Sequence, residues 1–459
     1  MKLTFCWAAK IVTWSCYHIE TWNTKFLVDC GMFQWPKEIG RLNYEPFLFD
    51  PKKIDFVLLT HAHIDHCGLI PKLYKQGFTG KIYTTSATRD IVWIILEDSA
   101  MIQEKNIEQE NKRRKQQHLP PRVPMYTLDD AKACMSLFKP IEYTEMIHLT
   151  DAIEARFQDA GHIMGSASIE LFITEWNEKK KLVFSWDIGQ WNTPIIRDPT
   201  LIQEADYLFM ESTYGNRTHE DTAGKKELLI KYVDETFKKW GKLLIPSFSV
   251  ERTQELLYFF NIIIKEWHFP KEKIFLDSPL SIKATEIFKK HTELYDEEAA
   301  KKYPHPFDFE ELECTQSVED SMKLNTYSDP CVIIAGNGMC TAGRITHHLR
   351  HGLSDPRNTL LFVWYQAEWT LGRYILEWEK KVWLMGENVD VKLEKQKING
   401  FSGHAGSDQL LRRAKGFTNP PKKTFIIHGE IDAETALESE LKKIGFVCEI
   451  PNIRDHIEL

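Results

Sequence analysis

The stretch Phe56-Val-Leu-Leu-Thr-His-Ala-His-Ile-Asp-His-Cys-Gly68 decides the fold and the chemistry of this chain. A run of β-favouring apolar residues ends at Thr60, and a helical pattern opens after Gly68. Between them lie four candidate metal ligands: His61, His63, Asp65 and His66. Imidazole and carboxylate suit zinc, and four such ligands crowd a single ion that must keep an open position. The spacing therefore predicts two metal ions, and a solvated histidine-rich loop is the alternative.

Length and composition indicate a globular protein of two or three domains. Of the 459 residues, 43% are hydrophobic and 27% are charged, and no apolar run is long enough to span a membrane. The net charge of −8 does not indicate a nucleic-acid-binding surface overall, although a local basic groove remains compatible with it. The nine cysteines are scattered without a Cys-x-x-Cys pair, which favours a reducing cytoplasm over a disulfide framework.

Three further predicted turns carry a candidate ligand. Asp29 follows the apolar run that begins at Lys25, and it can orient a ligand imidazole or simply cap a turn. His162 lies in a glycine- and serine-rich turn between two predicted strands. Asp187 ends the strand that begins at Lys181, and a carboxylate at this position can bridge two metals. Because each residue lies where a strand stops, we expect these side chains to project into a functional site.

The second half of the chain alternates helical and extended patterns over residues 220–395, which predicts a parallel, doubly wound α/β unit. Within it, Asn337 and Gly338 form a glycine-rich turn that can hold phosphate, and Arg252 opens a helix. Ser402 is a further candidate phosphate contact in a small, polar turn. Turn formation is the alternative role for these residues.

Taken together, these features resemble the metallo-β-lactamase superfamily and, within it, the β-CASP ribonucleases. The cleavage subunit of the mRNA 3′-end processing machinery and its bacterial and archaeal homologues are similar. The motifs that carry the resemblance are, in chain order, Asp29, residues 60–66, His162, Asp187, Glu211, His404 and His428. The resemblance implies an α/β fold in which residues 1–208 and 397–459 form an αββα sandwich. A parallel-sheet α/β β-CASP domain, residues 209–396, would be inserted into it.

The resemblance also implies a site with two Zn²⁺ ions. It assigns the ligands as follows: His61, His63 and His162 to the first ion, Asp65, His66 and His428 to the second, and Asp187 to both. Asp29 would act behind the ligands, and Asp65 would also be counted with the catalytic residues. His404 would be the general acid, with Glu211 orienting it.

The third β-CASP motif carries histidine in the RNA-cleaving members that this chain resembles and valine in the DNA-repair members. This chain has His428, so we expect a zinc-dependent ribonuclease of RNA processing or decay that acts on single-stranded RNA. It would be an endonuclease, with 5′→3′ exonuclease activity and homodimer formation left open. The alternatives are a small-molecule hydrolase of thioesters or lactams and a catalytically weak RNA-binding paralogue.

Tryptophan and glycine depart from the expected pattern. The chain has 14 tryptophans and 23 glycines, and glycine is therefore scarcer than the usual ~7%. Several tryptophans stand where the resemblance leads us to expect glycine: Trp7, Trp14, Trp35, Trp186, Trp364 and Trp369. Glycine is used where φ is positive or where backbones come close, so these positions predict strain.

Overall fold

The computed structural model describes residues 1–6, 10, 14–33, 40–176, 178–219, 224–266, 272–377 and 380–459. The chain divides into two compact units. The first comprises Met1–Thr193, Asp198–Thr218 and His404–Leu459, and the second comprises Pro194–Arg197 and His219–Gly403. The domain boundaries expected from the sequence, at 208/209 and 396/397, stay a prediction. Every helix in the described part of the chain is too short or too polar to cross a lipid bilayer.

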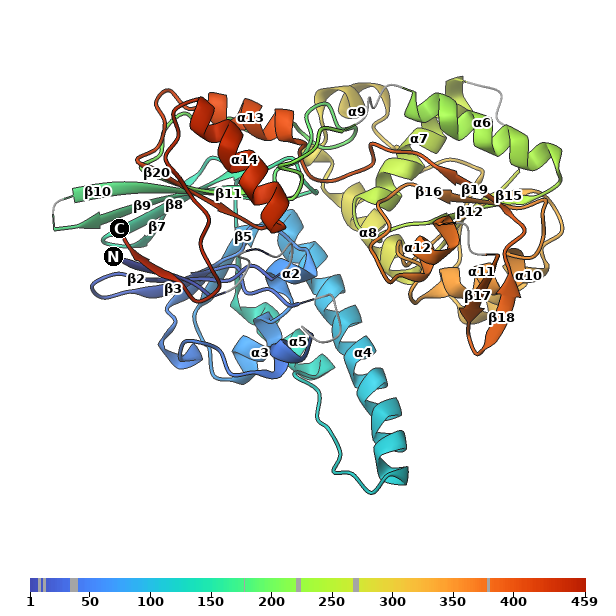
Figure 1. Cartoon of the computed structure of the whole chain (residues 1–459), viewed down its shortest axis with the longest axis horizontal. Helices are drawn as coiled ribbons and strands as arrows, with labels where there is room; N and C mark the ends of the chain where they lie inside the picture. Colours follow the sequence, from blue (N-terminus) through green and yellow to red (C-terminus); the bar gives the residue numbers. More distant parts are fainter. Residues whose placement is uncertain are drawn as a thin grey trace. The chain divides into compact units, whose positions relative to one another are not determined.

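Over the described residues, two seven-stranded sheets form the centre of the first unit (Figure 1). One has the order β22-β1-β2-β3-β4-β5-β6, with strands Lys2–Phe5 (β1), Tyr17–Glu20 (β2), Lys25–Val28 (β3), Phe56–Leu58 (β4), Lys81–Thr85 (β5), Phe138–Ile141 (β6) and His456–Glu458 (β22). The other has the order β21-β20-β11-β10-β9-β8-β7, with strands Met146–Thr150 (β7), Ile153–Asp159 (β8), Ala167–Glu175 (β9), Glu178–Trp186 (β10), Tyr207–Glu211 (β11), Lys423–Ile427 (β20) and Cys448–Glu449 (β21).

The two sheets pack face to face through an aromatic-rich core. Alternate residues of each strand point inward, as the two-residue period of a strand requires. Phe5 of β1 contacts Phe209 of β11 and Phe425 of β20, with ring centroids 6.1 Å and 5.7 Å apart. Such buried aromatic pairs hold the sheets together and fix which strand ends meet at their shared edge.

Helices cover the outer faces of both sheets (Figure 1). The first sheet is covered by α3 (Ile70–Lys75), α4 (Ser86–Gln116) and α5 (Leu128–Cys134), and the second by α13 (Ser407–Lys415) and α14 (Ile431–Lys443). α4 begins at Ser86 and continues through the charged run 104–116. The layers are therefore helix, sheet, sheet and helix, which confirms the αββα sandwich.

The second unit is built on a six-stranded parallel sheet within the described residues, with the order β14-β13-β15-β12-β16-β19. Its strands are Lys242–Pro246 (β12), Ile274–Asp277 (β13), Leu312–Cys314 (β14), Cys331–Ala335 (β15), Thr359–Phe362 (β16) and Glu394–Lys397 (β19). A hairpin joins Lys381–Leu384 (β17) to Glu387–Asp390 (β18). The helices are Lys225–Lys238 (α6), Arg252–Glu266 (α7), Pro279–Lys290 (α8), Glu297–Lys302 (α9), Val318–Thr326 (α10), Arg344–Gly352 (α11) and Leu371–Leu376 (α12). The predicted parallel α/β unit is confirmed.

Candidate metal centre

Strand ends of both sheets deliver the predicted site residues to one place in the first unit. β3 and β4 run parallel, as do β10, β11 and β20, so their carboxyl ends lie at common edges. The turn after β4 continues into the short helix α2 (Ile64–Cys67). Backbone hydrogen bonds fix this turn, because Ser15 N donates to Asp65 O at 2.7 Å and Cys30 N donates to His66 O at 2.8 Å. Gly31 makes this approach possible, since a Cβ there would overlap the Asp65 carbonyl.

A first group of ligand atoms forms around His63. Its Nδ1 lies 3.0 Å from His61 Nε2 and 3.1 Å from His162 Nε2. Asp187 Oδ2 completes the group at 3.4 Å from His61 Nε2 and 3.5 Å from His162 Nε2. One ligand atom from each of these four residues lies within 4.8 Å of the others. Three imidazoles and one carboxylate at this spacing are suited to one divalent ion.

A second group lies beside the first. His66 Nε2 and His428 Nε2 lie 3.9 Å and 3.6 Å from Asp65 Oδ2. Asp187 joins the groups, because its Oδ2 is 3.5 Å from His66 Nε2 and its Oδ1 is 3.5 Å from His428 Nδ1. The seven residues that the sequence predicted as ligands are thus brought together, with Asp187 between the two groups.

Asp29 lies behind the second group and is fully buried. Its Oδ2 accepts a hydrogen bond from His66 Nδ1 at 2.7 Å and another from Thr60 Oγ1 at 2.9 Å. Thr60 N also donates to Asp29 Oδ1 at 2.9 Å. A carboxylate that binds the far nitrogen of a ligand imidazole fixes the ring orientation and leaves the near nitrogen for the metal. These contacts are those expected of a group that orients a ligand imidazole, rather than of a residue that only caps a turn.

His404 and Glu211 form a pair at the border of the cluster, and a carboxylate oxygen of Glu211 also lies within 4.8 Å of ligand atoms of Asp187 and His428. His404 Nδ1 lies 3.2 Å from Glu211 Oε2, and the His404 ring centroid is 4.6 Å from that of His162. Glu211 is buried and also accepts hydrogen bonds from the backbone, with Ile188 N at 2.6 Å and Thr213 N at 3.3 Å. Glu211 is thereby held in place, and it in turn holds the His404 ring.

The protonation states separate the three imidazoles of the first ligand group from His404, whereas the charge of Asp187 raises the pKa of His66 and of His428 in the second group although burial opposes it. Burial lowers the pKa of His61 to about 3 and the pKa of His63 to about 4, so both imidazoles are neutral at pH 7 and able to bind metal. Burial also lowers the pKa of His162 well below its ordinary value. Burial opposes the charged form of His404, but the charge of Glu211 and its hydrogen bond raise the pKa of His404 to about 9. His404 is therefore an imidazolium at neutral pH.

The donor set fits divalent metal ions. In the described part of the site, three buried atoms lack a hydrogen-bond partner: His66 Nε2, Asp187 Oδ1 and His428 Nε2. Buried polar atoms are normally satisfied, and those that are not require an explanation such as an ion. Each of the three belongs to a group whose ligand atoms converge within 4.8 Å, and imidazole nitrogen with carboxylate oxygen is a typical zinc ligand set.

The four candidate phosphate contacts belong to the second unit. Arg252 is buried, and its Nη1 donates to Glu255 and, at 3.0 Å, to Phe401 O. Asn337 Oδ1 accepts a hydrogen bond from Met339 N at 2.8 Å, as expected of a turn-forming residue. Gly338 follows Asn337 in the same turn. Ser402 lies near the end of the unit. Their roles in RNA binding stay predictions.

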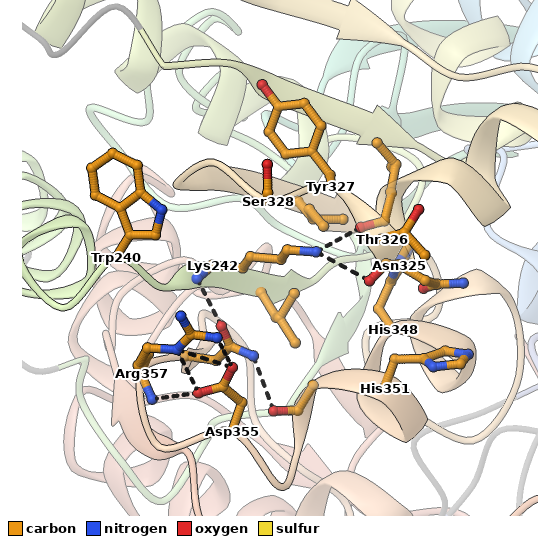
Figure 2. A pocket seen from close by; sticks show the side chains of 15 residues that line it. Trp240, Lys242, Asn325, Thr326, Tyr327, Ser328, His348, His351, Asp355 and Arg357 are labelled. Atoms are coloured by element: carbon orange, nitrogen blue, oxygen red, sulfur yellow. Dashed lines mark hydrogen bonds and ion pairs between the residues drawn. The ribbon is translucent and has the colours of Figure 1, made fainter.

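A pocket of about 400 Å³ in the second unit is distinct from these residues (Figure 2). It lies at the amino ends of β12, β15 and β16, whereas ligands of open α/β sheets bind at the carboxyl ends. Lys242 Nζ donates to the last carbonyls of α10, at 2.7 Å to Leu324 O, and Arg357 pairs with Asp355 at 2.7 Å. These charged side chains around the pocket bind other groups of the protein itself, and we assign the pocket no ligand.

Comparison with known proteins supports this arrangement. Three family models match: the metallo-β-lactamase superfamily at residues 15–163, the Beta-Casp domain at 253–375, and the Zn-dependent metallo-hydrolase RNA specificity domain at 388–451. The ribonuclease TTHA0252 of Thermus thermophilus is 36% identical over 95% of both chains. The chain belongs to the β-CASP family of the metallo-β-lactamase superfamily. This β-CASP protein is a metal-dependent hydrolase.

Other relatives of the β-CASP protein cover most of its length. A transcription termination factor FttA of Methanocaldococcus jannaschii is 32% identical over 94% of this chain and 67% of its own. An RNase J-like protein of the same organism is 31% identical over 93% of this chain and 92% of its own. A solved structure of a protein of unknown function from Enterococcus faecalis V583 covers 100% of this chain and 99% of its own, with a TM-score of 0.54 and 13% identity. That likeness concerns the fold alone.

Two residues of the site had no role assigned from the sequence. Thr60 binds both oxygens of Asp29 and also lies 3.1 Å from His61 Nδ1 through its hydroxyl. Thr213 Oγ1 lies 3.3 Å from His428 Nδ1. Each lies within two positions of a predicted site residue, but a threonine in such a position has no distinctive sequence pattern.

Proposed function

We propose that this β-CASP protein is a zinc-dependent ribonuclease that hydrolyses RNA phosphodiester bonds in RNA processing or decay, using two Zn²⁺ ions. The observation that carries the proposal is the Glu211–His404 pair beside a cluster with two groups of ligands. Hydrolysis of a phosphodiester by a two-metal mechanism needs ligands for the metal ions and a proton donor for the leaving oxygen, and this unit has both. The names of the relatives, which include a ribonuclease and an RNase J-like protein, support RNA as the substrate.

The proposed ligand sets follow the two groups. His61, His63 and His162 would hold one ion and Asp65, His66 and His428 the other, with Asp187 facing both. When bound, the ions supply a water of lowered pKa and absorb negative charge on the phosphoryl oxygens. Asp29 keeps the His66 ring turned toward the second position through the 2.7 Å hydrogen bond to Nδ1.

The chain itself supplies the proton for the leaving ribose oxygen. His404 Nδ1 is held by Glu211, which leaves Nε2 as the donor. A pKa of about 9 keeps that proton in place at neutral pH until the leaving oxygen gains charge. Asp65 lies in the second ligand group, and we count its carboxylate both as a ligand and among the catalytic residues.

The proposal also covers the form of the RNA substrate, the mode of cleavage, the oligomeric state and the location of the enzyme. We propose single-stranded RNA as the substrate, endonucleolytic cleavage as the main reaction, and 5′→3′ exonuclease activity and a homodimer as further properties to be tested. All nine cysteines are free, which supports the reducing cytoplasm as the location.

The proposal is tested by incubating the purified protein with end-labelled RNA and with DNA of the same sequence, with and without a chelator. We expect cleavage of RNA only, loss of cleavage with chelator, and recovery on addition of zinc. The double variant His61→Ala/His63→Ala should be inactive, and His148→Ala, at an exposed histidine, should retain activity. Chelator-resistant cleavage would contradict the metal mechanism. Hydrolysis of thioesters or lactams with no RNA cleavage would favour the small-molecule hydrolase, and zinc binding with neither activity would favour the RNA-binding paralogue.

A further inference from the structure

Half of the tryptophans that the structure describes adopt the left-handed backbone conformation. Five of the ten have a positive φ: Trp14 (73°), Trp176 (52°), Trp186 (51°), Trp240 (57°) and Trp369 (65°). This region is strained for a residue with a bulky side chain and is open to glycine. Trp364, which also stands where glycine was expected, does not have a positive φ. Trp7 and Trp35 are not among the residues that the structure describes.

Trp240 occupies a position at the end of α6 where glycine is strongly favoured. Trp240 N donates to Phe237 O at 2.9 Å, and Gly241 N donates to Thr236 O at 3.1 Å. This pair of hydrogen bonds defines the Schellman motif, in which the residue after the helix cap is left-handed and is usually glycine. The indole of Trp240 is instead 59% exposed, on the border of the pocket in Figure 2. The backbone thus has the form that glycine produces, and the side chain gains little from burial.

Two other left-handed tryptophans lie at exposed turns. Glu175 pairs with Glu178 across the β9–β10 hairpin, and Trp176 follows Glu175 in a turn where a positive φ selects glycine or asparagine. Trp369 precedes Thr370, which caps α12. Trp176 and Trp369 are 80% and 83% exposed, so packing does not compensate for their backbone conformation.

The remaining two are buried and crowd their neighbours. The ring centroid of Trp14 lies 3.0 Å from that of Phe33, whereas aromatic pairs normally lie about 4.5–7 Å apart. Trp186 immediately precedes Asp187, and its Nε1 lies too close to Asp29 Oδ2 for an ordinary hydrogen bond. That oxygen is the acceptor for His66 Nδ1. The indole therefore competes with a ligand histidine for its orienting carboxylate.

We infer that glycine occupies these five positions in the working enzyme, and that glycine at position 186 is a positioning residue for the second metal group. Without the indole, Asp29 Oδ2 is left to His66 and Thr60 alone. The scarcity of glycine in a chain with 14 tryptophans agrees with this inference. The positioning role of residue 186 for the second metal group rests on the proposed function. The inference that glycine occupies the five positions does not.

Peptide mass spectrometry of the protein purified from its natural host tests the inference directly. Peptides that contain positions 14, 176, 186, 240 and 369 should have the masses expected for glycine. Those that contain Trp93, in the middle of α4, and Trp383, in β17, should have the masses expected for tryptophan. The gene should then use one codon at the five positions and a different codon at 93 and 383. Tryptophan masses at the five positions would overturn the inference.

Single substitutions in the chain with the present sequence test the physical cause. Trp14→Gly, Trp186→Gly and Trp240→Gly should each raise the unfolding temperature of the metal-free protein, and Trp93→Gly should lower it, because glycine weakens a helix interior. Trp186→Ala should give a smaller gain than Trp186→Gly, since it removes the indole and leaves the strained φ. A lower unfolding temperature for all three glycine variants would overturn the inference.

The positioning role of residue 186 is measured by zinc binding in competition with a chelator. Trp186→Gly should tighten binding of the second zinc by about ten-fold, a typical effect of an orienting group, and should have little effect on the first. The gain should disappear in a chain that also carries Asp29→Asn. An unchanged affinity for the second zinc ion would overturn the positioning role, even if the protein cleaves RNA. Tighter binding of the second zinc ion without RNA cleavage would contradict only the proposed function.

Discussion

His404 is the residue whose proton the proposed reaction requires. We predict that His404→Ala retains both zinc ions and lowers the rate of RNA cleavage by about 10²–10⁴-fold, the usual contribution of a general acid. Because the acid form of His404 is lost above its pKa of about 9, the rate of the parent enzyme should fall as the pH rises through this value. Zinc content and single-turnover cleavage rates measure both effects. Loss of zinc from His404→Ala would place this histidine among the ligands instead.

Glu434 offers a test of stability that is separate from catalysis. It is fully buried in α14, and burial raises its pKa from 4.5 to about 7, with Lys10 N donating to Oε1 at 3.0 Å. Its Oε2 is buried without a hydrogen-bond partner in the described structure. The folded state therefore keeps a proton that the unfolded state has lost, and stability falls as the pH rises from about 4.5 toward 7.

We predict that Glu434→Gln is more stable than the parent by about 3 kcal/mol at pH 8, because the amide removes the buried charge. At pH 4, where the parent carboxyl is protonated in both states, the two proteins should have equal stability. Urea unfolding at the two pH values measures the difference. The exposed Glu430 provides the control, and Glu430→Gln should change stability little at either pH. A pH-independent effect of Glu434→Gln would contradict this account.

At the level of secondary-structure elements, Glu211 ties the end of β11 to the turn that follows β10. One carboxylate binds Ile188 N, Thr213 N and His404 Nδ1. We predict that Glu211→Gln keeps the fold, because the amide oxygen can still accept from Ile188 N, but removes the charge that raises the pKa of His404. The alkaline limb of the pH–rate profile should then move from about 9 toward the ordinary histidine value. An unmoved limb would show that another group controls it.

The alternation of strands and helices in the second unit was predicted from the sequence. Continuous apolar runs such as Cys331–Ala335 alternate there with amphipathic segments, and strands buried on both faces leave a clear signal. The first unit was harder. Its antiparallel strands β7 to β9 carry mixed residues, since one face packs on the core and the edge strand β7 is partly exposed.

At the scale of the whole molecule, the candidate site was predictable because its residues end strands. Parallel neighbours place their carboxyl ends at one edge, and so Asp187, Glu211 and His428 meet although they are far apart in sequence. Thr60 and Thr213 were not predictable in the same way, because a threonine beside a ligand has no distinctive pattern. Three of the tryptophans at positive φ, Trp14, Trp186 and Trp369, stand where the resemblance predicted glycine, whereas Trp176 and Trp240 were not predicted. The conflict between Trp186 and Asp29 required the three-dimensional arrangement.

The metal ions should also stabilise the fold. The cluster buries three carboxylates and several imidazoles against one another, and ions that bind only the folded state add about 4 kcal/mol when present at about 1,000 times their dissociation constant. We predict that a chelator lowers the unfolding temperature of the zinc-loaded protein, as measured by calorimetry. The variant His61→Ala/His63→Ala should respond less. Equal unfolding temperatures with and without chelator would contradict a metal centre built into the core.

The central claim is that RNA cleavage requires both groups of ligands to be filled. A zinc titration of the metal-free protein, with the rate of cleavage of end-labelled RNA measured at each point, tests it most directly. We predict little cleavage up to one equivalent of zinc per chain and a rise to the full rate as the second equivalent binds. Full activity at one equivalent, or activity that does not depend on zinc, would contradict the claim.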